Sequence, residues 1–158
     1  MADGALKAPP VALYPTPPLL FAAKTGALDA MKTLVAGGAR TDLKAGDGMT
    51  LAMAAAYSGN LAALEYALTL RPDVMATDSA GRGLMHMAVS NPDAAEPEKV
   101  ISYLMGKGVK LDAKDSRGRM PADAVTDNVR EFYLALLKQR GIEPDRLGPA
   151  DAGQAAAN

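Results

Sequence analysis

A repeat of 33 residues runs through this 158-residue chain. Gly26 and Gly59 are 33 residues apart, and Gly48 and Gly81 have the same spacing. Gly118 follows Gly81 after 37 residues, which is one period with an insertion of four. The segments that close the units keep one register: 37–45, 71–78 and 106–115. A period of this length is typical of solenoids, whose units stack because none can bury its apolar faces alone.

Each unit contains a short apolar helix, a glycine-containing turn, a longer helix and an extended linker. The inner helices are expected at 18–24, 51–58, 84–90 and 121–125. The outer helices are expected at 28–36, 61–70, 98–105 and 129–139. Apolar residues recur at helical spacing in the outer helices, as Val100, Ile101 and Leu104 do. The inner helices are rich in alanine, which lets neighbouring units approach closely. The predicted fold class is an all-α solenoid of stacked helix-turn-helix units.

Four stretches carry a recognisable motif: PPLLFAA (17–23), GMTLAMAAA (48–56), GRGLMHMA (81–88) and DSRGRMP (115–121). They resemble the ankyrin repeat family, whose unit runs D-x-x-G-x-T-P-L-H-x-A-A-x-x-G and closes with L-L-x-x-G-A-D-x-N-A-x-D. No unit is complete, since Thr50, His86 and Pro121 each keep a different residue of T-P-L-H. The resemblance covers about 14–140 and implies an ankyrin-repeat solenoid with short β-turn or hairpin tips.

The resemblance also suggests where the chain divides. It predicts a proline-containing N-terminal arm at 1–13, a repeat domain at 14–140 and a flexible C-terminal tail at 141–158. The repeats are expected at 14–45, 46–78, 79–115 and 116–140. The arm is an extended lead into the first helix or, through P-x-x-P at 15–18, an SH3-type ligand. The insertion at 91–97 is expected to project from the stack, as a partner-contact loop or a surface turn that has drifted.

Several residues of the motif have predicted structural tasks. Thr50 is expected to cap its inner helix, and Pro121 suits a first helical position that needs no N–H donor. Gly48, Gly81 and Gly118 permit positive φ in the turn before each helix. Asp78 and Asp115 suit hydrogen bonding across that turn. We interpret these residues as structural rather than catalytic.

The composition excludes several classes of function. Seventeen basic residues against 18 acidic ones leave a net charge of -1, which gives no basic surplus for nucleic acid. The chain has no cysteine and one histidine, so thiolate sites and His-rich metal clusters are excluded. No phosphate-binding, dinucleotide-binding, zinc-protease or nucleophile-elbow motif is present. The sequence therefore predicts a protein that is not an enzyme and has no cofactor, no nucleic-acid partner and no membrane span.

Protein binding is the function that the resemblance implies. In this register the turn tips and the exposed ends of the inner helices line one concave side, forming a rigid surface. The candidate partner-binding residues are Lys24, Asp47, Met49, Tyr57, Ser58, Arg82, Ser90, Asn91, Arg117 and Arg119; the remaining tip positions are Gly46, Ser79, Ala80 and Ser116. Three arginines on adjacent tips predict a locally basic ridge that suits an acidic patch on the partner.

A chain without a catalytic motif fits a dedicated inhibitor, immunity or accessory protein that binds one partner, such as an enzyme, in a stoichiometric complex. It is expected to be a monomer when free. The first ten residues lack the apolar region of a signal peptide, so the location is cytoplasmic by default. It would be periplasmic if a leader had preceded the given chain.

The alternative function is ligand or metal binding through methionine and histidine side chains. The residues concerned are Met49, Met53, Met85, His86, Met87 and Met105. Neighbouring residues on a helix point about 100° apart, so Met85, His86 and Met87 do not share one ion. His86 falls at the histidine of T-P-L-H, where it is expected to bond to nearby turn backbone. We therefore predict no metal site.

Overall fold

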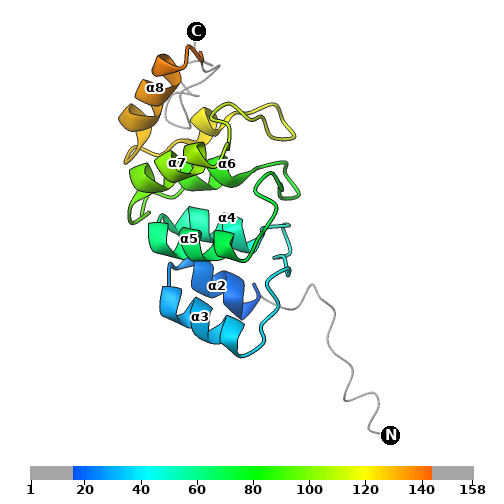
Figure 1. Cartoon of the computed structure of the whole chain (residues 1–158). Coiled ribbons are helices and arrows are strands. Elements are labelled where there is room, and N and C mark those ends of the chain that lie inside the picture. The colour runs from blue at the N-terminus through cyan, green and yellow to red at the C-terminus, as the bar shows by residue number, and fades with distance from the viewer. Residues whose placement is uncertain (1–15, 144–158) are drawn as a thin grey trace, which may run out of the picture.

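The computed structural model describes residues 16–143, which contain seven α-helices and one 3₁₀ helix (Figure 1). No strand occurs within these residues. The elements are α2 (Pro18–Lys24), α3 (Leu28–Ala36), α4 (Leu51–Ser58), α5 (Leu61–Thr69), α6 (Leu84–Val89), α7 (Pro97–Gly106), η2 (Pro121–Ala124) and α8 (Arg130–Gln139). The bounds of α2, α3 and α4 are those that the repeat pattern predicts, and the other α-helices agree within one residue at each end.

The helices form successive pairs that stack in chain order. In Figure 1 the pairs rise from α2 and α3 at one end to α8 at the other, and the turns between pairs project to one side. The inner helices α2, α4, α6 and η2 each pack on the next, and the outer helices α3, α5 and α7 do the same. The all-α repeat fold is therefore confirmed.

Helix α4 lies at the centre of the core because it packs between α2 and α6. Ala54, Ala55 and Ala56 are completely buried, as is Met53. Alanine on a helix packed on two sides allows close approach, and it also has the best helix propensity. Thr50 accepts a hydrogen bond from the Met53 amide, which confirms the predicted cap. Helix α4 is therefore buried by its two neighbours, α2 and α6, whereas its first turn is capped locally by Thr50.

The break between α4 and α5 has its own cap. Asn60 accepts a hydrogen bond from the Ala63 amide, and it donates one to the Gly26 carbonyl of the first unit. This turn separates the two halves of the apolar stretch 49–70 into short helices. None of the helices in the described part of the chain has the length and hydropathy needed to span a membrane.

A tight turn precedes each of α4, α6 and η2, and we call these turns the first, second and third tips (45–49, 78–82 and 115–119). Two backbone hydrogen bonds close each tip. In one, the first residue donates its amide to the carbonyl of the last: Ala45 to Met49, Asp78 to Arg82 and Asp115 to Arg119. In the other, the amide of Gly48, Gly81 or Gly118 donates to the carbonyl of that first residue. Successive tips are also joined, since the Ser79 amide donates to the Asp47 carbonyl and the Ser116 amide donates to the Ala80 carbonyl. The tips are therefore one hydrogen-bonded row and not three separate loops.

The prediction that the insertion at 91–97 projects from the stack is wrong. Ala95 and Glu96 donate backbone hydrogen bonds to the carbonyls of Ser58 and Gly59, at the end of α4. The last carbonyls of a helix have no partner within it, so the inserted segment satisfies groups that would otherwise need water. Ala94 lies so close to Gly59 that a Cβ added at Gly59 would be 2.5 Å from the Cβ of Ala94. The insertion thus fastens the third unit to the second.

The last inner helix also differs from its prediction. An α-helix was expected over 121–125, but η2 is a 3₁₀ helix that ends at Ala124, and Val125 is extended. Pro121 occupies its first position, as predicted. Thr126 then donates from both its amide and its hydroxyl to the Val89 carbonyl at the end of α6. The helix ends early because Val125 and Thr126 are β-branched, which disfavours a helix, and because the Val89 carbonyl at the end of α6 is free to accept hydrogen bonds from Thr126.

The two ends of the stack are unequal. Phe21 on α2 is 61% exposed, whereas Ala54 and Met87, at the same position of the next two units, are buried. At the other end, α8 stops at Gln139 and Gly141 follows with a φ of 68°. The predicted arm at 1–13, the first residue of the P-x-x-P segment at 15–18 and all but the first three residues of the predicted tail at 141–158 lie outside the described residues.

Arg71 is the one described residue other than glycine with a positive φ, at 58°. Glycine holds the same position after the other outer helices: Gly38, Gly108 and Gly141. A left-handed conformation costs an L-residue about 1–2 kcal/mol. Replacing Arg71 by glycine should therefore raise the free energy of unfolding by about 0.5 kcal/mol, since the loss of strain exceeds the added entropy of the unfolded chain. Chemical denaturation measures this change, and Arg71→Ala, which keeps the strain, should show no gain.

Two tip glycines provide a matched test of how closely the units approach. Gly81 and Gly118 share a φ of 76°. A Cβ at Gly81 would lie 2.6 Å from the Ser116 amide nitrogen, but one at Gly118 would meet nothing within 4 Å. We expect Gly118→Ala to cost about 1 kcal/mol through strain alone and Gly81→Ala to cost about 3 kcal/mol because the next tip must also move. Equal losses in thermal or denaturant unfolding would contradict the close contact between tips.

Candidate functional site

The buried side chain of Asp78 organises the second tip. Its Oδ1 atom accepts the amides of Ala80 and Arg82, each at 2.9 Å, and its Oδ2 atom lies 2.6 Å from Nη2 of Arg82. Burial alone would raise the pKa of Asp78, but the Arg82 side-chain hydrogen bond and the two amides together hold that pKa below its usual range. Asp78 therefore stays ionised, and its charge holds the tip closed.

The third tip repeats this arrangement. Asp115 accepts the amides of Arg117 and Arg119 at 2.8 and 2.9 Å, and Nε of Arg119 lies 3.3 Å from its Oδ2. Burial opposes the charge of Asp115 here too, and the amides of Arg119 and Arg117, followed by the Arg119 charge, outweigh it and lower the pKa. The prediction that Asp78 and Asp115 bond across their turns is confirmed.

The first tip replaces the ion pair by apolar packing. Ala45 and Met49 stand where the other tips have aspartate and arginine, and Met49 is only 8% exposed. The expectation that Met49 projects from the tip toward a partner is therefore wrong. A methionine with no carboxylate beside it gains more by entering the core than by facing water. Asp47 takes over the turn by accepting the Met49 amide at 3.0 Å, and its side chain stays exposed.

At the exposed ends of the inner helices, one predicted pair meets. The Nζ atom of Lys24 lies 5.3 Å from the centroid of the Tyr57 ring, which is a cation–π distance. Lys24 is exposed and Tyr57 is half-buried. An aromatic ring held by a neighbouring cation is a pre-ordered contact group, because little side-chain entropy remains to be lost on binding.

Three other predicted residues on these ends serve their own turns. Ser58 is buried; its hydroxyl donates to the Ala55 carbonyl and accepts the Asn60 amide. Asn91 donates to the Tyr57 carbonyl at 2.8 Å. Ser90 is half-buried and donates to the Met87 carbonyl. Ser58 is therefore engaged within its own turn and is not a surface contact, contrary to its place among the predicted binding residues, while Asn91 links two units.

The basic ridge predicted across the tips is narrower in the structure. Arg82 and Arg119 have side chains 39% and 45% exposed, but each is paired with the aspartate of its own tip. Arg117 and Lys114 are both exposed, and no ion pair joins either to another side chain in residues 16–143. Among the arginines of the tips, Arg117 on the third tip is therefore the one without an ion pair to another described residue, and Lys114 directly before that tip adds a second exposed positive charge.

The single histidine connects two tips. The Gly83 amide donates to Nδ1 of His86 at 3.3 Å, and Nε2 lies 3.1 Å from the carbonyl oxygen of Arg119. Nδ1 therefore accepts a hydrogen bond and Nε2 donates one, which is the pattern of a neutral imidazole that carries its proton on Nε2. The predicted bond from His86 to nearby turn backbone is confirmed, and the bond to the third tip adds a link between units.

The methionine and histidine side chains of the alternative metal-binding function lie in or against the core. Both nitrogens of His86 are engaged by backbone atoms, and Met53, Met85 and Met87 are buried. Within residues 16–143 no three histidine, cysteine or acidic side chains gather as metal ligands would. These methionines act as packing between units, which is a common use of a flexible apolar side chain.

A cleft of about 180 Å³ opens between the third and fourth units. Three of the predicted binding residues line it: Arg82, Ser90 and Arg119. His86 and Asp115 line it too, as does Asp123. Asp123 accepts the Met120 amide through Oδ2 at 2.8 Å, but its Oδ1 is buried and has no hydrogen-bond partner in the structure. In the sequence Asp123 stands at the position of His86 in the last unit, but the unpartnered oxygen depends on the folded surroundings of that residue.

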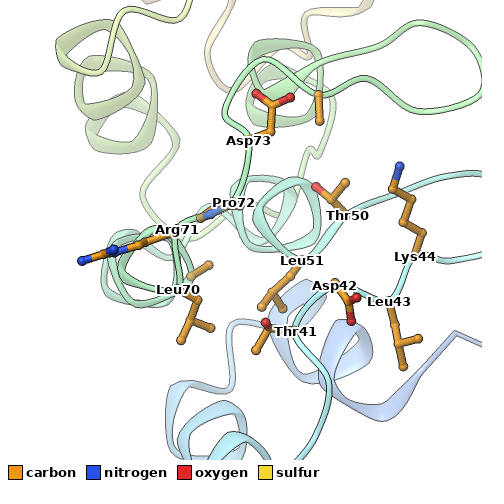
Figure 2. Close-up of a pocket in the computed structure, with 12 residues that line it drawn as sticks. Thr41, Asp42, Leu43, Lys44, Thr50, Leu51, Leu70, Arg71, Pro72 and Asp73 are labelled. Carbon is orange, nitrogen blue, oxygen red and sulfur yellow. The ribbon is translucent and has the colours of Figure 1, made fainter.

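A second cavity, of about 350 Å³, contains none of the predicted binding residues. It lies between the linkers 41–44 and 70–76, beneath the start of α4, and Figure 2 shows Leu51 among the residues that surround it. Thr41 stands where the next two units have Val74 and Leu111. The Arg71 side chain points away from the other lining residues.

The pKa of His86 leads to a prediction of how the free energy of unfolding depends on pH. Burial lowers the pKa of His86 below its ordinary value of 6.5, and the Arg82 charge adds to that effect; the Arg119 carbonyl and the charges of Asp115 and Asp78 oppose it without reversing it. The unfolded chain therefore takes up a proton first, so this stability is complete above pH 6.5 and is lost as the pH falls toward the pKa of the folded state.

We expect the free energy of unfolding to fall between pH 7.5 and 5, as measured by urea denaturation at each pH. His86→Gln should flatten this dependence, because glutamine does not titrate and the chain has no other histidine. An identical pH profile in the variant would refute this role of His86.

Comparison with known proteins agrees with this geometry. A family model described as ankyrin repeats (3 copies) matches residues 19–115, which is more than half of the chain. No curated protein matches the chain significantly. Ankyrin repeats are general protein–protein interaction modules, a role that suits a row of joined tips. The repeat period, the stacked helix pairs and the family match lead to one conclusion: this chain belongs to the ankyrin repeat family.

Proposed function

We propose that this chain binds one protein partner through its tip face, which we define as the three tips together with Lys24, Tyr57 and Ser90. The observation that carries the proposal is the row of hydrogen bonds between tips, from Ser79 to Asp47 and from Ser116 to Ala80. A surface whose backbone is already ordered loses little conformational entropy on binding. It therefore favours recognition of a folded partner.

The charge of the tip face indicates which partner it suits. The carboxylates of the second and third tips are occupied by their own arginines, so Lys114 and Arg117 are the exposed charges left around the third tip, whereas the first tip exposes the carboxylate of Asp47. Opposite charge on the partner would speed association and fix the orientation of the complex. We propose that the partner presents an acidic patch to the third tip.

We further propose that the chain acts as an inhibitor, immunity or accessory protein of an enzyme. Three features support this role: the sequence contains none of the catalytic motifs considered above, the described helices bring no metal-ligand cluster together, and the rigid face suits a stoichiometric complex. The chain would be monomeric until it meets its partner.

The test begins with capture of the partner by the tagged chain in its native organism, followed by mass spectrometry and titration calorimetry of the purified pair. The double variant Lys114→Glu/Arg117→Glu should bind at least tenfold more weakly at low ionic strength, because it places negative charge opposite the acidic patch. The loss should shrink in high salt, which screens exposed charges.

The control is Lys138→Glu/Arg140→Glu, which makes the same change of charge at the end of α8, an outer helix. It should bind as the unchanged protein does. If both double variants bind equally, the tip face is not the binding surface. A Tyr57→Ala variant then tests the other end of the face, where affinity should fall through loss of an aromatic contact.

A further inference from the structure

The cleft between the third and fourth units has an unbalanced charge. The guanidinium of Arg82 is neutralised by Asp78 and that of Arg119 by Asp115, at 2.6 and 3.3 Å. Asp123 has no ion pair among the described residues, and the described residues that line the cleft bring no further cation. One carboxylate is thus left over where the two ion pairs meet.

The unit pattern explains why this carboxylate has a free side. In the third unit, His86 accepts its own turn amide through one nitrogen and reaches the next tip through the other. Asp123 holds the same position in the fourth unit, and its Oδ2 accepts the Met120 amide in the same way. Its Oδ1 corresponds to the nitrogen that reaches onward, but a carboxylate oxygen accepts hydrogen bonds and does not donate them.

An unsatisfied buried oxygen is costly, so a donor that enters the cleft would gain the full value of that bond. The oxygen is shielded from bulk solvent, and the residue that carries it lines the cleft. The volume of about 180 Å³ accommodates the head of one side chain but not a peptide segment. The missing charge is positive, and the missing group is a hydrogen-bond donor.

We propose that this cleft binds the guanidinium of an arginine presented by the protein partner. The inference rests on the proposed function for the source of the arginine. Arginine fits better than lysine because its planar, weakly hydrated guanidinium enters a half-closed site at less cost. Asp123 supplies the acceptor, and the Ser90 side chain stands at the same cleft. The partner surface would then be acidic opposite the third tip and carry one arginine beside it.

The test needs no partner, because the chain has a single histidine and that histidine lines the cleft. N-acetyl-arginine amide is titrated into the full chain at pH 7.5 and constant ionic strength while the imidazole resonance of His86 is followed by NMR. We expect a saturable shift with a dissociation constant on the order of a millimolar, as a ligand of this size allows. N-acetyl-citrulline amide, the same shape without the charge, should not saturate.

Asp123→Asn should weaken arginine binding at least tenfold. This variant keeps an oxygen for the Met120 amide. Asp127→Asn, which makes the same change of charge at a residue outside the cleft, should bind as the wild type does. Equal binding of both probes, no saturation with arginine, or unchanged binding by Asp123→Asn would each overturn the proposal.

The comparison of the two probes uses the unchanged chain, so it decides the matter even if a variant does not fold. Its outcome is also separate from that of the partner experiment. Failure of the Lys114 and Arg117 reversal to affect a partner would remove the proposed function but not a cleft that selects arginine over citrulline.

Discussion

Burial of each inner helix between two others is the constraint on which this structure depends. Helix α4 is almost entirely buried because α2 and α6 cover its two sides, and no part of α4 can be core without them. Polar groups follow the same rule. The carbonyls at the end of α4 receive hydrogen bonds from the inserted segment of the next unit, and those at the end of α6 receive them from Thr126. Each unit completes both the apolar packing and the hydrogen bonding of its predecessor.

The same dependence governs the tips, where one geometry is maintained by two kinds of chemistry. In the second and third tips a buried carboxylate collects two amides and an arginine, and in the first tip Met49 packs into the core while Asp47 caps the turn from outside. The backbone bonds that close each tip are the same in all three. A surface built in this way can change its charge from tip to tip without changing its shape, which separates the requirements of folding from those of recognition.

Repeat period alone predicted most of the fold, because 33-residue spacing fixes both the helices and the register of the tips. The helices α2, α3 and α4 begin and end where the pattern places them, and Asp78 and Asp115 have the predicted bonds. The binding surface was harder to predict. Register shows that Met49, Arg82 and Arg119 are equivalent but not that one is buried and the others are paired within their own tips.

Long-range contacts were the other missing information. Nothing local in the segment 91–97 indicates that it returns to Gly59, because the acceptors it meets belong to another unit. The free oxygen of Asp123 was likewise hidden, since its environment depends on residues brought together from the second and third tips, α6 and η2. The nearest signal in the sequence is the comparison of equivalent positions. Asp123 in the fourth unit replaces His86 of the third, so a hydrogen-bond acceptor stands where the third unit has a donor.

The exposed ring of Phe21 has a consequence for how the molecule opens. In a one-dimensional stack an interior unit has two interfaces, but the unit at an uncovered end has one. Phe21 leaves to solvent a position that Ala54 and Met87 bury in the units that follow. Local opening should therefore start at α2 and α3 and cost progressively more free energy inward, so that amide protons of the first unit exchange with solvent well before those of α4 and α6.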